Sequence, residues 1–402
     1  MGKTGVFFIG VSGYIATAVI AGALALKKGL SDRTGMVTEL PHFNGLALAE
    51  PADMAFGGWD IRTGSPLESA VSLFKSAGLP SELLSAIEGG LIEVSPNICH
   101  GITTNCGRTI ELLSADTATE RAMTLEAQAL KLRKDIAGFR EKNSLDCVVV
   151  VNLASTEPPL EARPSHETPD GFEECVMEDR SEEVRASAIY AYAAILEGCP
   201  YINFTPSNAL VPALVELARK NGVPVMGNDG KTGETLVKSA LAPMFLYRNL
   251  EVLSWEGVNL LGNMDGRVLS DPENRESKII SKDGILHKVL GYAPHSRVRI
   301  DFVPSLDDVK TAWNFIHFRG FLGSRMTMQF IWQGYDSLLA APLILDLVRL
   351  SDLSKRRGEG GPMTHLASFF KAPVGVDEHR YFKQAEMLFR YAEKAKESGV
   401  HT

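Results

Sequence analysis

Three lysines of the sequence stand where an ammonium group could take part in chemistry. Lys278 and Lys282 are four positions apart, which places both on one face of a helix beside serine hydroxyls. Lys371 follows two phenylalanines and precedes an Ala-Pro turn. A lysine in apolar surroundings gives up its proton more readily and can serve in proton transfer. Two alternatives stay open: a solvated helix face for the pair, and a side chain that reaches the surface for Lys371.

A glycine turn near the N-terminus could hold a nucleotide. Gly10-Val-Ser-Gly13 follows a β-type run at 5–10 and precedes a helical pattern over 16–28. In such a turn the backbone approaches a pyrophosphate, whose charge then lies at the helix N-terminus. The usual fingerprint is altered, because the middle glycine is shifted by one position and Ala16 replaces the last one. The turn therefore favours dinucleotide binding, with a tight packing turn as the open alternative.

A second turn, Gly227-Asn-Asp-Gly-Lys-Thr-Gly233, also follows a β-type run. It ends like the phosphate-binding loop of ATPases, but Val225 occupies a position where that loop requires glycine. We therefore do not expect an ATPase. What remains is Asp229, an acid close to a lysine in a polar turn.

Alternating strand and helix patterns indicate the elements that position these residues. β-type runs at 147–151, 200–204 and 224–226 are separated by helical patterns that include 117–142 and 182–196. This alternation predicts an α/β fold with a Rossmann-like, doubly wound parallel sheet.

The length of 402 residues exceeds what one compact core usually holds, so more than one domain is expected. We predict a nucleotide-binding domain at 1–235, an inserted α+β domain at 236–338 that binds substrate, and a return to the first domain at 339–402. The inserted part contains strand-like runs at 252–254 and 300–303.

Charge and cysteine content argue against several classes of protein. A net charge of -8 without a basic stripe excludes nucleic acid as an expected partner. The uncharged run at 5–26 is broken by glycine, serine and threonine, so we interpret it as a strand, a turn and a buried helix rather than a membrane span. The five cysteines include no close pair, which indicates reduced thiols in a cytoplasmic protein. Cys99, His100 and Cys106 do not complete a zinc-binding spacing, and hydrolase and kinase motifs are incomplete.

Several segments, in order, resemble the signatures of the myo-inositol-1-phosphate synthase family. They begin with Gly57-Gly-Trp-Asp-Ile61 and end with Phe370-Lys-Ala-Pro373, so the resemblance covers most of the chain. The segments between them are Pro200-Tyr-Ile-Asn-Phe-Thr-Pro-Ser-Asn208, Gly227-Asn-Asp-Gly-Lys-Thr-Gly233, Asn259-Leu-Leu-Gly-Asn-Met-Asp-Gly266 and Ser277-Lys-Ile-Ile-Ser-Lys282. The resemblance implies an NAD-dependent isomerase that forms a homotetramer through the inserted domain.

The family's site residues can be carried over to matching positions of this sequence. Asp60 matches the acid that family members place on the adenosine ribose of NAD, and Asp229 matches an acid near the nicotinamide. The implied NAD-binding residues are Gly10, Ser12, Gly13, Tyr14, Ile15, Asp60, Asn152, Ser155, Thr205, Asp229, Asn263, Asp265 and Asp336. The implied catalytic residues are Lys278, Lys282, Lys310, Lys371, Asp229 and Asn259.

Three positions depart from the family pattern. Asn228 replaces an acid, Glu234 replaces a glutamine and Met264 replaces an asparagine. These changes touch the surroundings of the nicotinamide and of a divalent or monovalent cation. A cation therefore stays an open possibility, and no metal ligands are assigned.

The resemblance implies that NAD oxidises C5 of D-glucose 6-phosphate, that the C6 enolate attacks the C1 aldehyde, and that the C5 ketone is reduced again to give 1L-myo-inositol 1-phosphate. Charge on oxygen must be stabilised at each stage. We expect Lys278 and Lys371 around the C5 oxygen, Lys310 at the C1 oxygen and Lys282 on the phosphate or enolate. A dehydrogenase of another sugar phosphate and a non-catalytic NAD-binding scaffold remain as alternatives.

Overall fold

The structure, a computed structural model, describes residues 2–115, 122–262 and 285–398. Its larger part is a parallel seven-stranded sheet in the order β11-β6-β5-β4-β1-β2-β3. These strands are β1 (Thr4–Ile9), β2 (Ala55–Asp60), β3 (Ile98–His100), β4 (Cys147–Asn152), β5 (Tyr201–Asn203), β6 (Pro224–Met226) and β11 (Gly361–Pro362). The predicted Rossmann-like, doubly wound sheet is confirmed.

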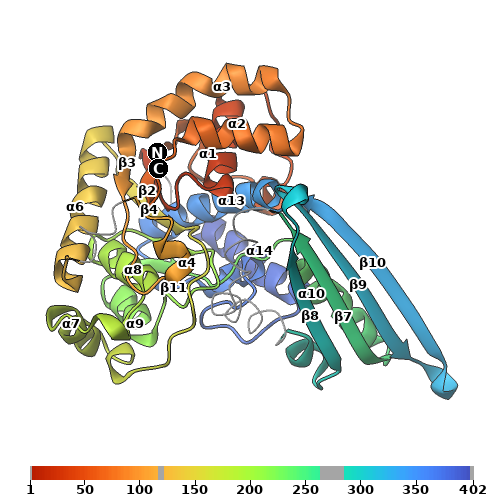
Figure 1. Ribbon diagram of the computed structural model, residues 1–402. Helices are drawn as coiled ribbons and strands as arrows, with labels where there is room; N and C mark the ends of the chain where they lie inside the picture. The colour runs from red at the N-terminus through yellow and green to blue at the C-terminus, as the bar shows by residue number, and fades with distance from the viewer. Residues whose placement is uncertain (1, 116–121, 263–284, 399–402) are drawn as a thin grey trace.

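Helices cover both faces of this sheet (Figure 1). Because the sheet is enclosed, its central strands are mostly apolar, and every residue of β1 is buried. One face packs against α1 (Tyr14–Lys27), α2 (Pro66–Ala77), α3 (Ser81–Val94), α13 (Asp336–Arg356) and α14 (Tyr381–Glu397). The other packs against α6 (Leu125–Asn143), α7 (Pro169–Met177), α8 (Ala186–Leu196) and α9 (Pro212–Lys220), and the short α4 (Arg108–Glu111) follows β3.

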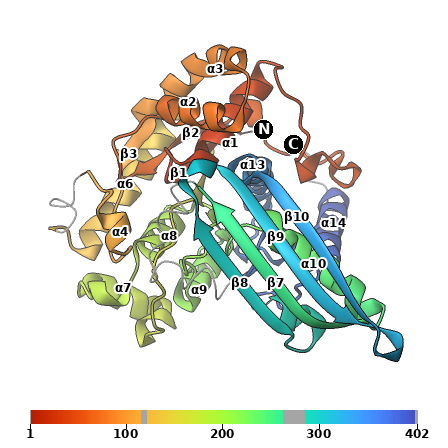
Figure 2. The same ribbon diagram turned by 45° about the vertical axis from the view of Figure 1, so that its right-hand side comes forward.

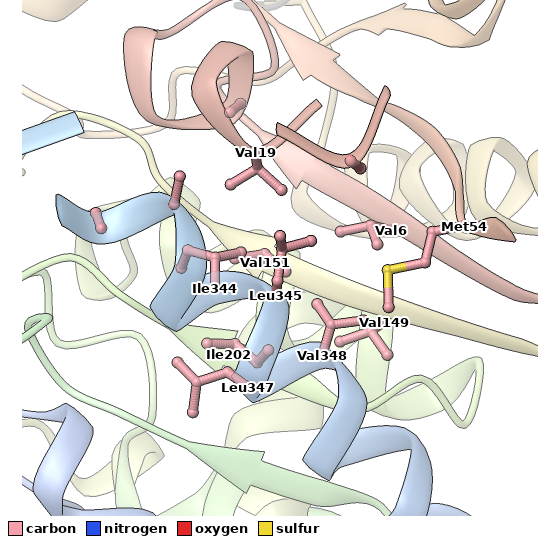
Figure 3. Packing of buried hydrophobic residues seen from close by; sticks show 14 of the residues in the cluster. Val6, Val19, Met54, Val149, Val151, Ile202, Ile344, Leu345, Leu347 and Val348 are labelled. Carbon is pink, nitrogen blue, oxygen red and sulfur yellow. The ribbon is translucent and has the colours of Figure 1, made fainter. Parts of the chain in front are cut away.

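Helix α13 brings the chain back to the parallel sheet. Figure 3 shows Leu345 and Val348 of this helix in one apolar cluster with Val6, Val149 and Val151 of the central strands. All five side chains are buried. This packing fixes α13 on the sheet, and with it the acid Asp336 at the first position of the helix.

A second, four-stranded sheet extends from the side of the first, in the order β10-β9-β7-β8. Its strands are β7 (Glu251–Leu261), β8 (His295–Phe302), β9 (Val309–Arg319) and β10 (Arg325–Tyr335). Strands β7 and β8 are parallel, whereas β9 runs antiparallel to β7 and β10. Figure 2 shows this sheet from the front, with α10 (Gly233–Tyr247) on its other side, where Phe245 packs on Trp255 and Phe318.

The second sheet is larger than the sequence patterns predict. Strand β7 extends to Leu261 instead of ending at 254, and β9 and β10 have no counterpart among the predicted runs. Polar residues alternate with apolar ones along these strands because one face of the sheet is exposed, so continuous apolar runs do not reveal them. Among the helices around the parallel sheet, α6 begins at Leu125 rather than at the predicted residue 117, because Thr124 caps its N-terminus.

The apolar run at 5–26 forms strand β1, the glycine turn and most of helix α1, as predicted. Among the residues that the structure describes, no helix has the length and apolarity needed to cross a membrane.

Candidate active site

A cavity of about 700 Å³ opens at the carboxyl ends of the parallel strands. Gly10 follows β1, Asp60 ends β2, Asn152 ends β4 and Asp229 lies beyond β6. This edge is where open α/β sheets bind their ligands. The cavity brings together the predicted residues Gly10, Ser12, Gly13, Tyr14, Ile15, Asp60, Asn152, Ser155, Thr205, Asp229, Lys310, Asp336 and Lys371.

The glycine turn has the geometry that a pyrophosphate requires. Gly10 has a φ of +86°, a conformation that residues with side chains rarely adopt. A Cβ atom on Gly13 would lie only 3.1 Å from the carbonyl oxygen of Gly10. Helix α1 begins at Tyr14 beside the cavity, and no side chain caps its first N–H groups. These residues fit a dinucleotide, because the loop admits a phosphate closely and the helix N-terminus attracts its charge.

The carboxylate of Asp60, only 5% exposed, joins the glycine turn to the loop after β2. It accepts hydrogen bonds from the backbone N–H of Ser12 at 2.9 Å and from Nε of Arg62 at 3.1 Å. Ile61 and Ile110 pack together beside it on the cavity wall, where an apolar surface suits an adenine ring. Arg62 was not predicted, although a basic residue two positions after the strand-end acid was visible in the sequence.

Lys371 and Asp229 form an ion pair at the cavity, with Nζ 2.7 Å from Oδ1. Their side chains are only 10% and 5% exposed. The pair is held by backbone hydrogen bonds between the two turns, including Lys371 N–H to the carbonyl of Asp229 and Asn228 N–H to that of Ala372, both at 2.7 Å. The apolar setting expected for Lys371 is present, since Phe370 before it is buried. This ammonium can donate a hydrogen bond to an oxygen of a bound molecule while Asp229 orients it.

A second ion pair joins Lys310 of β9 to Asp336 at the start of α13, with Nζ 2.7 Å from Oδ2. The Lys310 side chain is 15% exposed. Lys310 stands opposite Leu261 of β7 and Gly334 of β10, at the end of the second sheet that meets the cavity. The second sheet therefore places the ammonium of Lys310 in a cavity at the edge of the first sheet.

The departure at Asn228 has a local explanation. Its side-chain oxygen accepts a hydrogen bond from the amide of Asn203 at 2.6 Å, and Asn152 donates to Asn203 at 3.1 Å. Three neutral amides thus connect the ends of β4 and β5 with the turn that carries Asp229. A carboxylate at 228 would add a negative charge beside Asp229, and the asparagine avoids it.

Lys231, in the same turn, is a buried lysine to which the sequence patterns assigned no role. It is 2% exposed, its ammonium contacts Oε1 of Gln384 on α14, and it does not line the cavity. Burial lowers the pKa of Lys231 to about 7, and the charge of nearby Lys371 contributes to the lowering.

The lowered pKa of Lys231 predicts a pH-dependent stability. The unfolded chain holds this proton up to about 10.5, whereas the folded chain releases it above about 7, so the folded state binds fewer protons between these values. The free energy of unfolding is therefore expected to rise by about 2 kcal/mol between pH 7 and 9 relative to Lys231→Met. Urea denaturation at both pH values measures this rise. Lys383→Met, which removes an exposed lysine, should keep it, and an equal pH dependence with and without Lys231 would contradict the prediction.

Asn259, a predicted catalytic residue, does not line the cavity. It is fully buried, and its amide donates to Oε2 of Glu234 at 2.6 Å. Glu234 also pairs with Lys238 one helical turn later, at 2.9 Å, and both of these side chains are 2% exposed. Glu234, one of the three positions that depart from the family pattern, thus belongs to a buried charged cluster between α10 and the second sheet.

Glu157 is a further buried acid on the cavity wall. Its carboxylate accepts hydrogen bonds from the backbone N–H and the hydroxyl of Ser187 at the start of α8. Burial raises the pKa of Glu157 to about 7, although these donors oppose the rise. It was not predicted, because only the fold places the loop after β4 against α8.

Four predicted residues, Lys278, Lys282, Asn263 and Asp265, lie outside the described residues. Within the ranges that the structure describes, no three His, Cys, Asp or Glu side chains are grouped so that they could hold a metal ion.

A Rossmann-like sheet with an open glycine turn, and with two lysine–carboxylate pairs in the same cavity, is the architecture of an NAD-dependent enzyme. Residues 4–392 match the model of the myo-inositol-1-phosphate synthase family, and the chain belongs to this family. The matching model describes an NAD-binding domain, so the predicted cofactor is confirmed.

Relatives across bacteria and eukaryotes agree with this assignment. An inositol-3-phosphate synthase 1 of Bacteroides thetaiotaomicron is 34% identical, with 94% of this chain and 91% of the relative covered. An inositol-3-phosphate synthase of Trypanosoma brucei brucei is 33% identical, over 88% of this chain and 73% of the relative. The crystal structure of an inositol-3-phosphate synthase from Caenorhabditis elegans superimposes with a TM-score of 0.85 at 26% identity, over 98% of this chain and 86% of the other.

Proposed function

We propose that the protein cyclises D-glucose 6-phosphate to 1L-myo-inositol 1-phosphate and regenerates its NAD in each turnover. The observation that carries this proposal is the placement of two lysine–carboxylate pairs, Lys371–Asp229 and Lys310–Asp336, in the cavity that contains the glycine turn. A dehydrogenase needs one proton-transfer site for its alcohol, whereas an intramolecular aldol reaction develops charge on two oxygen atoms.

In this proposal the glycine turn and Asp60 would hold NAD+, which would supply the hydride acceptor for C5 and the hydride donor for the later reduction. Lys371, as the neutral amine, takes up the proton of the C5 hydroxyl and returns it when the C5 ketone is reduced, and Asp229 orients the ammonium that exists between these steps. Lys310 donates a hydrogen bond to the C1 oxygen while the new C–C bond forms, and Asp336 orients it. We assign Lys278 and Lys282 to the C5 oxygen and to the phosphate or enolate, on the family resemblance.

The stoichiometry of NADH tests the proposal. Incubation of the protein with NAD+ and glucose 6-phosphate should give inositol phosphate in the 31P and 1H NMR spectra without net growth of the NADH absorbance. Release of one NADH per substrate would instead indicate a sugar-phosphate dehydrogenase. NAD+ binding without any conversion of the sugar phosphate would indicate a scaffold.

We further propose that copies of the chain assemble as a homotetramer through the outer face of the second sheet. Val258, Trp313 and Ile331 are opposite one another on β7, β9 and β10 and form an apolar row across that face. Trp313 and Ile331 are 36% and 65% exposed. An exposed apolar row on a sheet is typical of an interface with another protein surface. The proposed inserted domain, residues 236–338, contains this sheet.

The assembly proposal predicts the effect of a charge on this face. Ile331→Glu is expected to reduce the molar mass measured by light scattering from that of a tetramer to that of a smaller species, because the carboxylate would lose its hydration in the interface. Phe382→Glu, at an exposed phenylalanine of α14, is the matched control and should leave the mass unchanged. An unchanged mass for Ile331→Glu would place the interface elsewhere.

We also propose a cytoplasmic location. It is supported by the five cysteines, all of which are free thiols.

A further inference from the structure

The carboxylate of Asp60, at the end of β2, accepts four hydrogen bonds from its own chain. Asp60 accepts hydrogen bonds from the backbone N–H of Ser12 at 2.9 Å and from the backbone N–H of Arg62 at 3.0 Å. The Arg62 guanidinium adds two more, from Nε at 3.1 Å and Nη2 at 3.3 Å. A carboxylate has about four acceptor sites, so these four bonds fill them. A ribose hydroxyl that donates to Asp60 must therefore displace one of them.

The Arg62 side chain keeps donors for a ligand. A guanidinium carries five N–H bonds, and the two directed at Asp60 leave three. The side chain is 37% exposed and lines the cavity. A planar guanidinium of this kind can hold a carboxylate on one edge and a phosphate oxygen on another.

The position of this pair determines which part of a dinucleotide it meets. In a Rossmann fold the acid at the end of the second strand lies beside the adenosine ribose, whose 2′-hydroxyl distinguishes NAD from the 2′-phosphate of NADP. An unpaired carboxylate there repels a 2′-phosphate. Arg62 balances the charge of Asp60 at this point. The nearby acid Glu68 is turned to the backbone N–H of Ser65 in the cap of α2.

We infer that Arg62 is a specificity residue that admits the 2′-phosphate of NADP+ to the dinucleotide site, so that the protein binds both dinucleotides. The inference rests on the proposed function, because it takes the cavity to be the NAD site. It also gives Arg62 opposite effects on the two ligands. Arg62 donates to the phosphate of NADP+, but it competes with the 2′-hydroxyl of NAD+ for the oxygens of Asp60.

Binding measured by calorimetry, without turnover, tests this inference. The unaltered protein should bind NADP+ within about tenfold of its Kd for NAD+, since charge-assisted bonds to the phosphate offset its desolvation. Arg62→Ser should weaken NADP+ binding by at least about tenfold. The same variant should bind NAD+ as tightly as before or more tightly. Two compounds that carry only the adenosine end should respond in the same way. Adenosine 2′,5′-bisphosphate should bind more weakly to Arg62→Ser, as NADP+ does, whereas 5′-AMP should bind as tightly as before or more tightly, as NAD+ does.

Two further variants make the test specific. Arg62→Lys keeps the charge but not the forked geometry of the guanidinium. Its affinity for NADP+ should lie between that of the unaltered protein and that of Arg62→Ser. Arg390→Ser removes an exposed arginine on α14 and should change neither Kd. This variant controls for the overall loss of one positive charge.

The possible results separate the inference from the proposed function. If NAD+ binds and NADP+ binds more than about tenfold more weakly to the unaltered protein, the inference is wrong and the proposed function stands. If Arg62→Ser weakens both ligands equally, Arg62 only shapes the loop and the inference is also wrong. If neither dinucleotide binds, the inference and the proposed function fail together.

Discussion

Lys371→Ala is expected to lower kcat for glucose 6-phosphate cyclisation by about 10³-fold or more, because it removes a positioned proton-transfer group and a cation at a developing oxyanion. The Lys371 ammonium is 2.7 Å from Asp229 and is mostly buried, so water cannot replace it in the same position. NAD+ binding should be retained, since the substitution leaves the glycine turn and Asp60 in place. Calorimetry measures the Kd for NAD+, and NMR of the inositol phosphate product measures the rate.

Two other variants distinguish chemistry from folding. Lys383→Ala removes an exposed lysine from α14 and should cyclise at the normal rate. Asp229→Asn keeps the shape of the turn but removes the charged partner of Lys371, so kcat should fall, but by less than in Lys371→Ala. Normal cyclisation by a folded Lys371→Ala protein would show that the catalytic assignment is wrong.

The parallel sheet was predictable because its strands are enclosed on both faces. Continuous apolar runs such as that of β4, together with helical patterns between them, identify a doubly wound sheet without knowledge of long-range contacts. The glycine turn alone was ambiguous, since an altered fingerprint also fits a packing turn. Its position next to Asp60 in one cavity supports the interpretation as a nucleotide site.

The pairing of the site residues could not be predicted from the sequence. Lys371 meets Asp229 because residues 369–372 run beside the turn after β6, and Lys310 meets Asp336 because β9 and β10 pair in register. These contacts join positions far apart in the chain, and local periodicity carries no information about them. The burial of Lys231 depends in the same way on α14, which packs over the turn from the C-terminal end of the chain.

The surroundings of Glu234, which replaces a glutamine of the family pattern, could also not be predicted from the sequence. In the sequence it is a changed residue near the nicotinamide, whereas in the fold it pairs with Lys238 and Asn259. It sits against Gly257 of β7, whose missing side chain makes room for the carboxylate. We therefore expect a substitution of Glu234 to change the stability of the fold.

Lys238→Met is expected to lower the free energy of unfolding by about 3–5 kcal/mol, because it removes one partner of a buried ion pair. The ammonium is 2.9 Å from Glu234, both side chains are 2% exposed, and Lys238 also lies 5.9 Å from the centre of the Trp255 ring. Without the ammonium of Lys238, the carboxylate of Glu234 stays buried and has lost the positive charge that balances it. Urea denaturation at pH 7 measures the loss.

A second substitution at the partner should restore much of this stability. In Glu234→Gln/Lys238→Met both charges are gone, and a glutamine can still accept the hydrogen bond from Asn259. Replacement of a buried ion pair by neutral groups of similar size is often close to neutral, so the double variant should be more stable than Lys238→Met alone. The double-mutant cycle then gives the coupling between the two residues. If the double variant is as unstable as Lys238→Met, the loss comes from packing around the lysine stem rather than from the unbalanced charge.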